Sequence, residues 1–284
     1  LAAGAQCSVT VRYSPVTTGT HNASNLNIVF DDGTVAGPAP LTHDLDGNSA
    51  VPASLTITEI TPGDTNFGTI VHTNTLARTF NVNNSGQINA TTVVEGGLGA
   101  PYSITGGTCA FPTVTPGSPS CTIEVTFSPV DVGTGVQVYP DTISLAYNDG
   151  TGAAAPATLA ITGTGQDRAL LTYTPLSHDF GNVAIGGEVT QTFTVTNTGD
   201  EQAANITSQA FGLPTYYEFP GGFPGNVGAT PCGLTLAGGA TCQVDVDFNP
   251  PGGAAVNQND TLDIRYDDGI AIGTAATASL DGTP

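Results

Sequence analysis

The side chains best suited to covalent chemistry in this sequence are its five cysteines. Cys109 precedes Cys121 by 12 residues and Cys232 precedes Cys242 by 10 residues, each pair at the same place in a repeated pattern. Paired thiols that recur across a short loop predict two disulfides, each stabilising its fold by roughly 3 kcal/mol in the chain-entropy model. Metal binding is the alternative, but the sequence offers no set of four suitably spaced Cys or His ligands.

The fifth cysteine, Cys7, has no partner at the corresponding distance in this sequence. By analogy with the other two pairs, we expect its partner about ten residues before Leu1. A bridge to another chain is the alternative. Because disulfides persist only under oxidising conditions, the pattern predicts a secreted, periplasmic or cell-surface protein.

Carboxylates are the second group of side chains that could do chemistry. They gather in three turns, at Asp31 and Asp32, at Asp149, and at Asp267 and Asp268. Such oxygens suit calcium, and paired carboxylates can also serve glycoside hydrolysis. Their recurrence at an Asp-Gly hairpin in every unit favours a structural turn instead. We therefore predict no catalytic residues, and treat Asp31, Asp32, Asp267 and Asp268 only as weak calcium candidates, calcium being the one cofactor considered.

The overall charge excludes two classes of partner. The chain has four basic residues, all arginine, against 24 acidic ones, which gives a formal net charge of −20. Nucleic-acid binding and attraction to anionic lipid both need clustered positive charge, so neither is expected. No apolar stretch reaches the ~18 residues needed to span a membrane, so we expect no direct membrane insertion in this segment.

The elements that position these side chains are predicted by a motif that occurs three times. It is a cysteine followed by alternating apolar residues and a closing proline, at Cys7–Pro15, Cys121–Pro129 and Cys242–Pro250. Alternation with period two predicts a half-buried β-strand in an antiparallel sheet. The proline ends the ladder because it has no N–H to donate.

Other segments repeat with the same spacing. Phe67-Gly68 returns as Phe180-Gly181, and Thr79–Gly86 returns as Thr192–Gly199, both 113 residues later. Short strands separated by frequent turn signals predict an all-β chain of tandem immunoglobulin-like β-sandwiches arranged as a rod. We predict the C-terminal part of an incomplete repeat over residues 1–50 and complete repeats over residues 51–165 and 166–284.

The last repeat carries about ten more residues than the middle one before its cysteine pair. We place this insertion near residues 219–230, where aromatic residues, Pro and Gly are frequent. Insertions in repeat arrays often form binding surfaces, although a harmless surface loop is the simpler interpretation. The candidate contact residues are Tyr216, Tyr217, Phe219 and Phe223.

The segments Thr115–Pro129 and Leu236–Pro250, with the Phe-Gly and Thr-x-Thr-Asn segments of Phe180–Gly199, resemble a known signature. It is that of bacterial ASH-type, Hydin-like repeats, also found as the choice-of-anchor D domain. The resemblance covers nearly the whole chain. It implies immunoglobulin-like tandem domains in large secreted or surface proteins of bacteria, without a common catalytic activity.

These observations favour a non-enzymatic extracellular structural protein, a segment of a bacterial surface fibre, stalk or filament. Its partners would be copies of itself in a fibre or neighbouring repeats of the same chain. An adhesin that binds a cell-surface glycan or protein is one alternative, and accessory repeats of a larger secreted enzyme are another.

Overall fold

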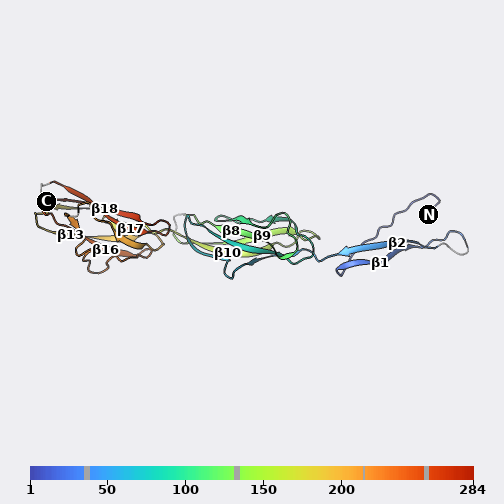
Figure 1. The fold of residues 1–284 in the computed structure, drawn as a ribbon. Helices are drawn as coiled ribbons and strands as arrows, with labels where there is room; N and C mark the ends of the chain where they lie inside the picture. The colour runs from blue at the N-terminus through green and yellow to red at the C-terminus, as the bar shows by residue number, and fades with distance from the viewer. Residues whose placement is uncertain (35–38, 131–134, 214, 253–255) are drawn as a thin grey trace.

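The computed structural model describes residues 1–34, 39–130, 135–213, 215–252 and 256–284. Within these residues the secondary structure is all β, and no helix could span a membrane. The strands form three units that follow one another along one line, with the two termini at opposite ends (Figure 1). The sequence-based prediction of an all-β rod of sandwiches is confirmed.

The first unit is a single hairpin rather than a sandwich. Strands β1 (Gly19–Ile28) and β2 (Leu41–Ser49) pair antiparallel, with a register shift between His21 and Ser24. The motif Cys7–Pro15 is not part of any ladder, so the prediction of a strand there is wrong for this copy. The reason is physical: in the other two copies this strand lies between two neighbours that hydrogen-bond to it, and the described residues provide neither neighbour here.

The middle unit is a sandwich of two four-stranded sheets, ordered β3-β5-β8-β7 and β4-β10-β9-β6. All pairs are antiparallel except β4 with β10, which is parallel. The strands are β3 (Leu55–Glu59), β4 (Asn66–Val71), β5 (Leu76–Asn84), β6 (Thr91–Glu95), β7 (Tyr102–Gly107), β8 (Gly117–Phe127), β9 (Gln137–Asn148) and β10 (Ala157–Gln166).

The last unit repeats this topology, with sheets β11-β13-β16-β15 and β12-β18-β17-β14 and the same parallel pair, β12 with β18. The strands are β11 (Leu171–Thr174), β12 (Ser177–Asn182), β13 (Val189–Asn197), β14 (Ala204–Ser208), β15 (Tyr217–Glu218), β16 (Thr241–Phe248), β17 (Gln258–Asp267) and β18 (Thr274–Thr283).

Each sandwich has its own apolar core between its sheets. The repeated motif supplies the centre of it: Val125 and Phe127 in the middle unit, and Val246 and Phe248 in the last, are completely buried. Their polar neighbours in sequence lie on the opposite face of the sheet, as period two requires. Only residues 50–54 separate β2 from β3, and only residues 167–170 separate β10 from β11.

Candidate functional site

A buried asparagine at the end of strand β5 in the middle unit, and of strand β13 in the last, holds each sandwich together. The Asn84 side chain is 1% exposed, and its carbonyl oxygen accepts from the backbone N–H of Ser54 (3.1 Å) and of Gly86 (3.0 Å). Its amide nitrogen donates to the carbonyls of Ile88 (2.9 Å) and Val114 (3.1 Å). All four hydrogen-bonding positions of the amide are therefore used, which is what burial of so polar a group requires.

Asn197 makes the same four bonds in the last unit. Its oxygen accepts from Leu170 (3.0 Å) and Gly199 (3.1 Å), and its nitrogen donates to the carbonyls of Glu201 (2.8 Å) and Leu236 (3.1 Å). A Cβ on Gly199 would come within 1.9 Å of the Arg168 carbonyl oxygen. The glycine is thus needed because two backbone segments approach closely here. The asparagine side chain hydrogen-bonds to three backbone segments.

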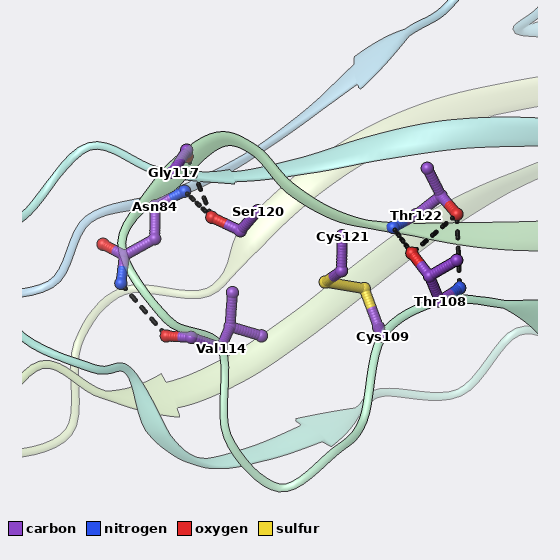
Figure 2. Close-up of a disulfide and its surroundings, with 8 residues drawn as sticks. All are labelled: Asn84, Thr108, Cys109, Val114, Gly117, Ser120, Cys121 and Thr122. Carbon is purple, nitrogen blue, oxygen red and sulfur yellow. Dashed lines mark hydrogen bonds between the residues drawn. A yellow bond between two sulfur atoms is a disulfide. The ribbon is translucent and has the colours of Figure 1, made fainter.

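We call the hydrogen bonds around each buried asparagine the corner of its unit. The disulfide Cys109–Cys121 lies beside the corner of the middle unit, near Asn84 (Figure 2), with Cα atoms 4.8 Å apart. It joins the central strand β8 to the segment that follows edge strand β7. Thr108 and Thr122 support it from the next position: Thr122 N–H donates to the Thr108 hydroxyl at 2.9 Å, and the two hydroxyls are 3.2 Å apart. Between the cysteines, the chain passes Val114, whose carbonyl accepts the bond from Asn84.

The second disulfide, Cys232–Cys242, has the same Cα separation of 4.8 Å. The structure thus contains both predicted bridges. Cys7 is exposed and forms no disulfide within the described residues.

The aromatic insertion of the last unit lies against its own sandwich. Tyr217 is 1% exposed and donates its hydroxyl proton to the Gln258 carbonyl, so the prediction that it contacts a partner is wrong. Burial, reinforced by nearby carboxylates, raises the pKa of Tyr217. Tyr216, Phe219 and Phe223 are partly buried and pack on the same core, with the Phe219 ring 4.8 Å from that of Phe211. Aromatic side chains in such a loop can either pack into the core or stay exposed to a partner, and here they pack against the core.

The same insertion covers the edge of strand β16. Asp245 N–H donates to the Pro224 carbonyl (2.9 Å), and Gln243 N–H donates to that of Thr230 (2.8 Å). Beneath it, Asp245 and Asp247 are nearly buried and accept from the hydroxyls of Thr192 and Thr190, both at 2.6 Å. The insertion therefore takes the place of an edge strand.

The carboxylates of the three turns are bonded to their own turns. Asp32 accepts from the Thr34 N–H (2.9 Å) and hydroxyl (2.8 Å), and the Thr34 hydroxyl lowers the pKa of Asp32. Asp31 accepts from Gly33 N–H at 2.8 Å. No group of three or more His, Cys, Asp or Glu side chains suited to a metal occurs among the described residues.

The equivalent carboxylates in the last unit accept more hydrogen bonds. Asp268 is fully buried and accepts from the N–H groups of Ala271 (2.6 Å) and Ile270 (2.9 Å). Desolvation raises its pKa, but these hydrogen bonds outweigh it and the pKa is lowered. Asp267 accepts from Asn205 at 2.6 Å. The two calcium candidates of the last unit thus have protein donors as partners.

The middle and last units meet at a compact junction. His72, directly after β4, is 4% exposed, and its Nδ1 lies 2.8 Å from the Asp167 carboxylate in the linker. The Asp167 carbonyl accepts from Glu201 N–H at 2.9 Å, and Gln166 donates to the Glu201 carboxylate. Linker residue Asp167 is therefore bonded to both units at once.

Backbone contacts complete this junction. His72 N–H donates to the Gln166 carbonyl at 2.8 Å, and Ala169 N–H donates to the carbonyl of Asp268 at 3.0 Å. A Cβ on Gly269 would come within 3.3 Å of the Val71 side chain. Bonds to the linker from both sides, with apolar contact beside it, restrict the hinge motion that a four-residue linker would otherwise permit.

Comparison with known families agrees with this geometry for the last unit. Residues 169–282 match the model of the HYDIN/CFA65/VesB-like, Ig-like domain. The last unit is a HYDIN-like Ig domain. The sequence resemblance stated above is confirmed there, and the middle unit repeats its topology, corner and disulfide.

Several solved structures show low similarity to this chain. A protein of unknown function from Porphyromonas gingivalis W83 is 11% identical, with a TM-score of 0.31, over 81% of this chain and 99% of that one. The VesB protease of Vibrio cholerae is 12% identical (TM-score 0.28), over 94% and 99%. The ASH/PapD-like domain of human CEP192 is 16% identical (TM-score 0.26), over 40% and 83%. Comparison with curated protein sequences finds no significant match.

Two features of this geometry were not predicted from the sequence. The first is the pair Asn84 and Asn197, although each ends an alternating strand and stands two positions before a glycine. The second is the contact of His72 with the linker. No local pattern identifies His72, because its partner Asp167 is 95 residues away.

Proposed function

We propose that this chain is a non-enzymatic structural segment of an extracellular fibre or stalk, in which Ig-like units carry tension from one to the next. The junction between the middle and last units is the observation that supports this most directly. Strand β10 ends at Gln166, and β11 begins only at Leu171. Asp167 between them is bonded to both units. Force on one unit would pass to the next without first extending a loose linker.

The fold places the two ends of each sandwich in different sheets. In the middle unit, β3 pairs with β5 at one edge, while β10 lies inside the other sheet between β9 and β4. Pulling the termini apart loads both ladders along the strands (Figure 1). Several hydrogen bonds of a ladder must then break together. A ladder loaded in this way resists force better than one whose bonds open one at a time. The buried Asn84 and Asn197 add bonds at the end where β3 and β11 enter.

The disulfides limit how far a unit can extend after it opens. Cys109–Cys121 removes 12 residues from the extensible chain, and Cys232–Cys242 removes 10. At ~3.5 Å per extended residue, these correspond to about 40 and 35 Å. Disulfides also support an oxidising, extracellular location. The non-catalytic nature of the proposal rests on the Ig-like domain type and on carboxylates that are bonded to their own turns.

Single-molecule force spectroscopy tests the proposal on the full chain. We expect two unfolding events, with contour-length increments that grow by about 40 and 35 Å when the disulfides are reduced. The double variant C109S/C121S is the matched control and should lengthen only one increment under oxidising conditions. Negative-stain electron microscopy should show rods. Compact particles, or unfolding at forces no higher than those of an unstructured chain, would overturn the proposal.

A further inference from the structure

Residues 7–28 and 41–49 already have the arrangement of half a sandwich. The ring of Tyr13 lies over Gly47, because a Cβ on that glycine would meet the ring at 2.5 Å. The ring centroid is also 5.9 Å from that of His21, at 61°. The complete units place the equivalent ring on the equivalent glycine, as Phe127 on Gly163 and Phe248 on Gly282. Phe127 likewise meets Tyr139 at 5.8 Å and 62°.

The apolar face of this half is open. Val9, Val11 and Tyr13 are 55%, 51% and 48% exposed. Their equivalents Ile123, Val125 and Phe127 are at most 1% exposed. A hollow of about 580 Å³ lies between residues 11–17 and the β1–β2 hairpin, lined among others by Leu45 and Gly47. Exposed apolar faces of this kind are characteristic of interaction sites.

The complete units show what covers the equivalent face. Phe127 packs against Phe67, from strand β4, at 5.8 Å and against Tyr102, from strand β7, at 4.8 Å. Strand β4 also pairs parallel with β10, the equivalent of β2, and β5 and β7 flank β8, the equivalent of residues 7–15. All three covering strands belong to the first half of the unit, residues 55–107.

We propose that residues 7–28 and 41–49 form an acceptor site for the first half of a HYDIN-like Ig unit, a polypeptide segment with the sequence pattern of residues 51–112. The segment would add a parallel strand beside β2, place strands on both sides of residues 7–15, and fill the hollow with two aromatic side chains. This is strand addition with pockets for alternate side chains, a recognised mode of peptide binding.

Cys7 gives this site a covalent partner. It occupies the position of Cys121, whose sulfur is bonded to Cys109, a residue that follows the last strand of the first half. A bound segment would therefore bring its own cysteine to Cys7. If that cysteine carries glutathione, the Cys7 thiolate attacks its sulfur, the new disulfide forms and glutathione leaves as the thiolate.

The test uses the full chain with a separate polypeptide of residues 51–112 whose Cys109 carries glutathione. At micromolar concentrations, we expect the Cys7–Cys109 adduct to form at least about a hundred times faster than the adduct with glutathione-modified cysteine alone, because binding raises the effective concentration. Mass mapping should place the bond at Cys7. The matched control is the same polypeptide with F67D and F80D, which should react no faster than the free amino acid.

A second measurement removes the thiol chemistry. The C7S chain should bind the C109S polypeptide in a calorimetric titration, and V11D in that chain should abolish binding while leaving the middle and last units folded. Equal reaction rates for the F67D/F80D control would show a merely exposed thiol and overturn the proposal. Absence of binding by the C7S chain would also overturn it, as would a stable dimer of that chain that V11D dissociates, because a second copy would then cover the face.

Discussion

The middle and last units have cores and asparagine corners built in the same way, but they protect one sheet edge in different ways. In the middle unit, β7 runs for six residues along β8. In the last unit, β15 runs for only two, and the aromatic insertion supplies the remaining carbonyls to β16. Tyr102 and Tyr217 nevertheless occupy the same place, opposite Phe127 and Phe248.

This difference shows which parts of the unit are interchangeable. Hydrogen bonds to an edge strand can come from any backbone that lies at the right distance, so the edge tolerates an insertion. The buried asparagine cannot be replaced in this way, because one side chain satisfies four backbone groups on three segments. We therefore expect substitutions at the corner to have large and equal effects in both units, and substitutions at the edge to separate them.

The largest effect is expected from N84A and N197A. Each leaves four backbone groups without a partner, two in buried and two in partly buried hydrogen bonds. At ~1–3 kcal/mol for each unsatisfied group and with partial rescue by water, we expect a loss of roughly 3–5 kcal/mol. In urea unfolding of the full chain, N84A should lower the transition of the middle unit and N197A that of the last. N83A, at the more exposed neighbouring position, is the control and should change little. Equal, small effects of all three variants would show that the corner is dispensable.

Removal of a disulfide should come next, at about 3 kcal/mol for either pair. The variants C109S/C121S and C232S/C242S should lower the urea midpoint of their own unit by similar amounts, because the loops they close differ by only two residues. The wild-type chain measured with reductant should match the double variants. A much larger loss in the last unit would mean that its insertion depends on Cys232 for its position.

Substitution of an aromatic residue in the insertion should lower the stability of the last unit and leave that of the middle unit unchanged. Phe219 packs on Phe211, and Phe223 lies 5.3 Å from Phe219 at 88°. Both rings are only partly buried, so F219A should destabilise the last unit by ~1–2 kcal/mol, less than the ~3–5 kcal/mol typical of a fully buried Phe. I104A, on the corresponding edge of the middle unit, is the comparison. Binding of the wild-type chain to a glycan array that F219A abolishes without loss of stability would instead support the adhesin alternative.

The sequence predicts most strands of both units, but it predicts some residues wrongly, for reasons that differ from one element to another. Strands such as β8 and β16 follow from alternation alone, because a period of two has one structural meaning in a half-buried sheet. The same alternation failed at Cys7–Pro15, since a strand also needs neighbours to pair with. Tyr217 was misassigned because an aromatic residue beside a Pro- and Gly-rich loop has the same sequence pattern whether it fills a core or faces solvent.

The smallest effect concerns the turn carboxylates and pH. Hydrogen bonds lower the pKa of Asp149 and Asp268 below the ordinary value of an aspartate, the bond from the Thr151 hydroxyl being the main cause for Asp149. A carboxyl whose pKa is lower in the folded state stabilises the fold above the unfolded pKa, and this stabilisation disappears as the pH falls through the folded pKa. Both units should therefore lose stability below about pH 4, measured as the urea midpoint between pH 6 and pH 2.

The D268N variant should flatten that pH dependence for the last unit. Its cost near neutral pH should be about 1 kcal/mol, because the amide keeps an acceptor oxygen for Ala271 and Ile270 but loses the charge opposite Arg168. An unchanged pH profile in D268N would assign the acid sensitivity of the last unit to carboxylates other than Asp268.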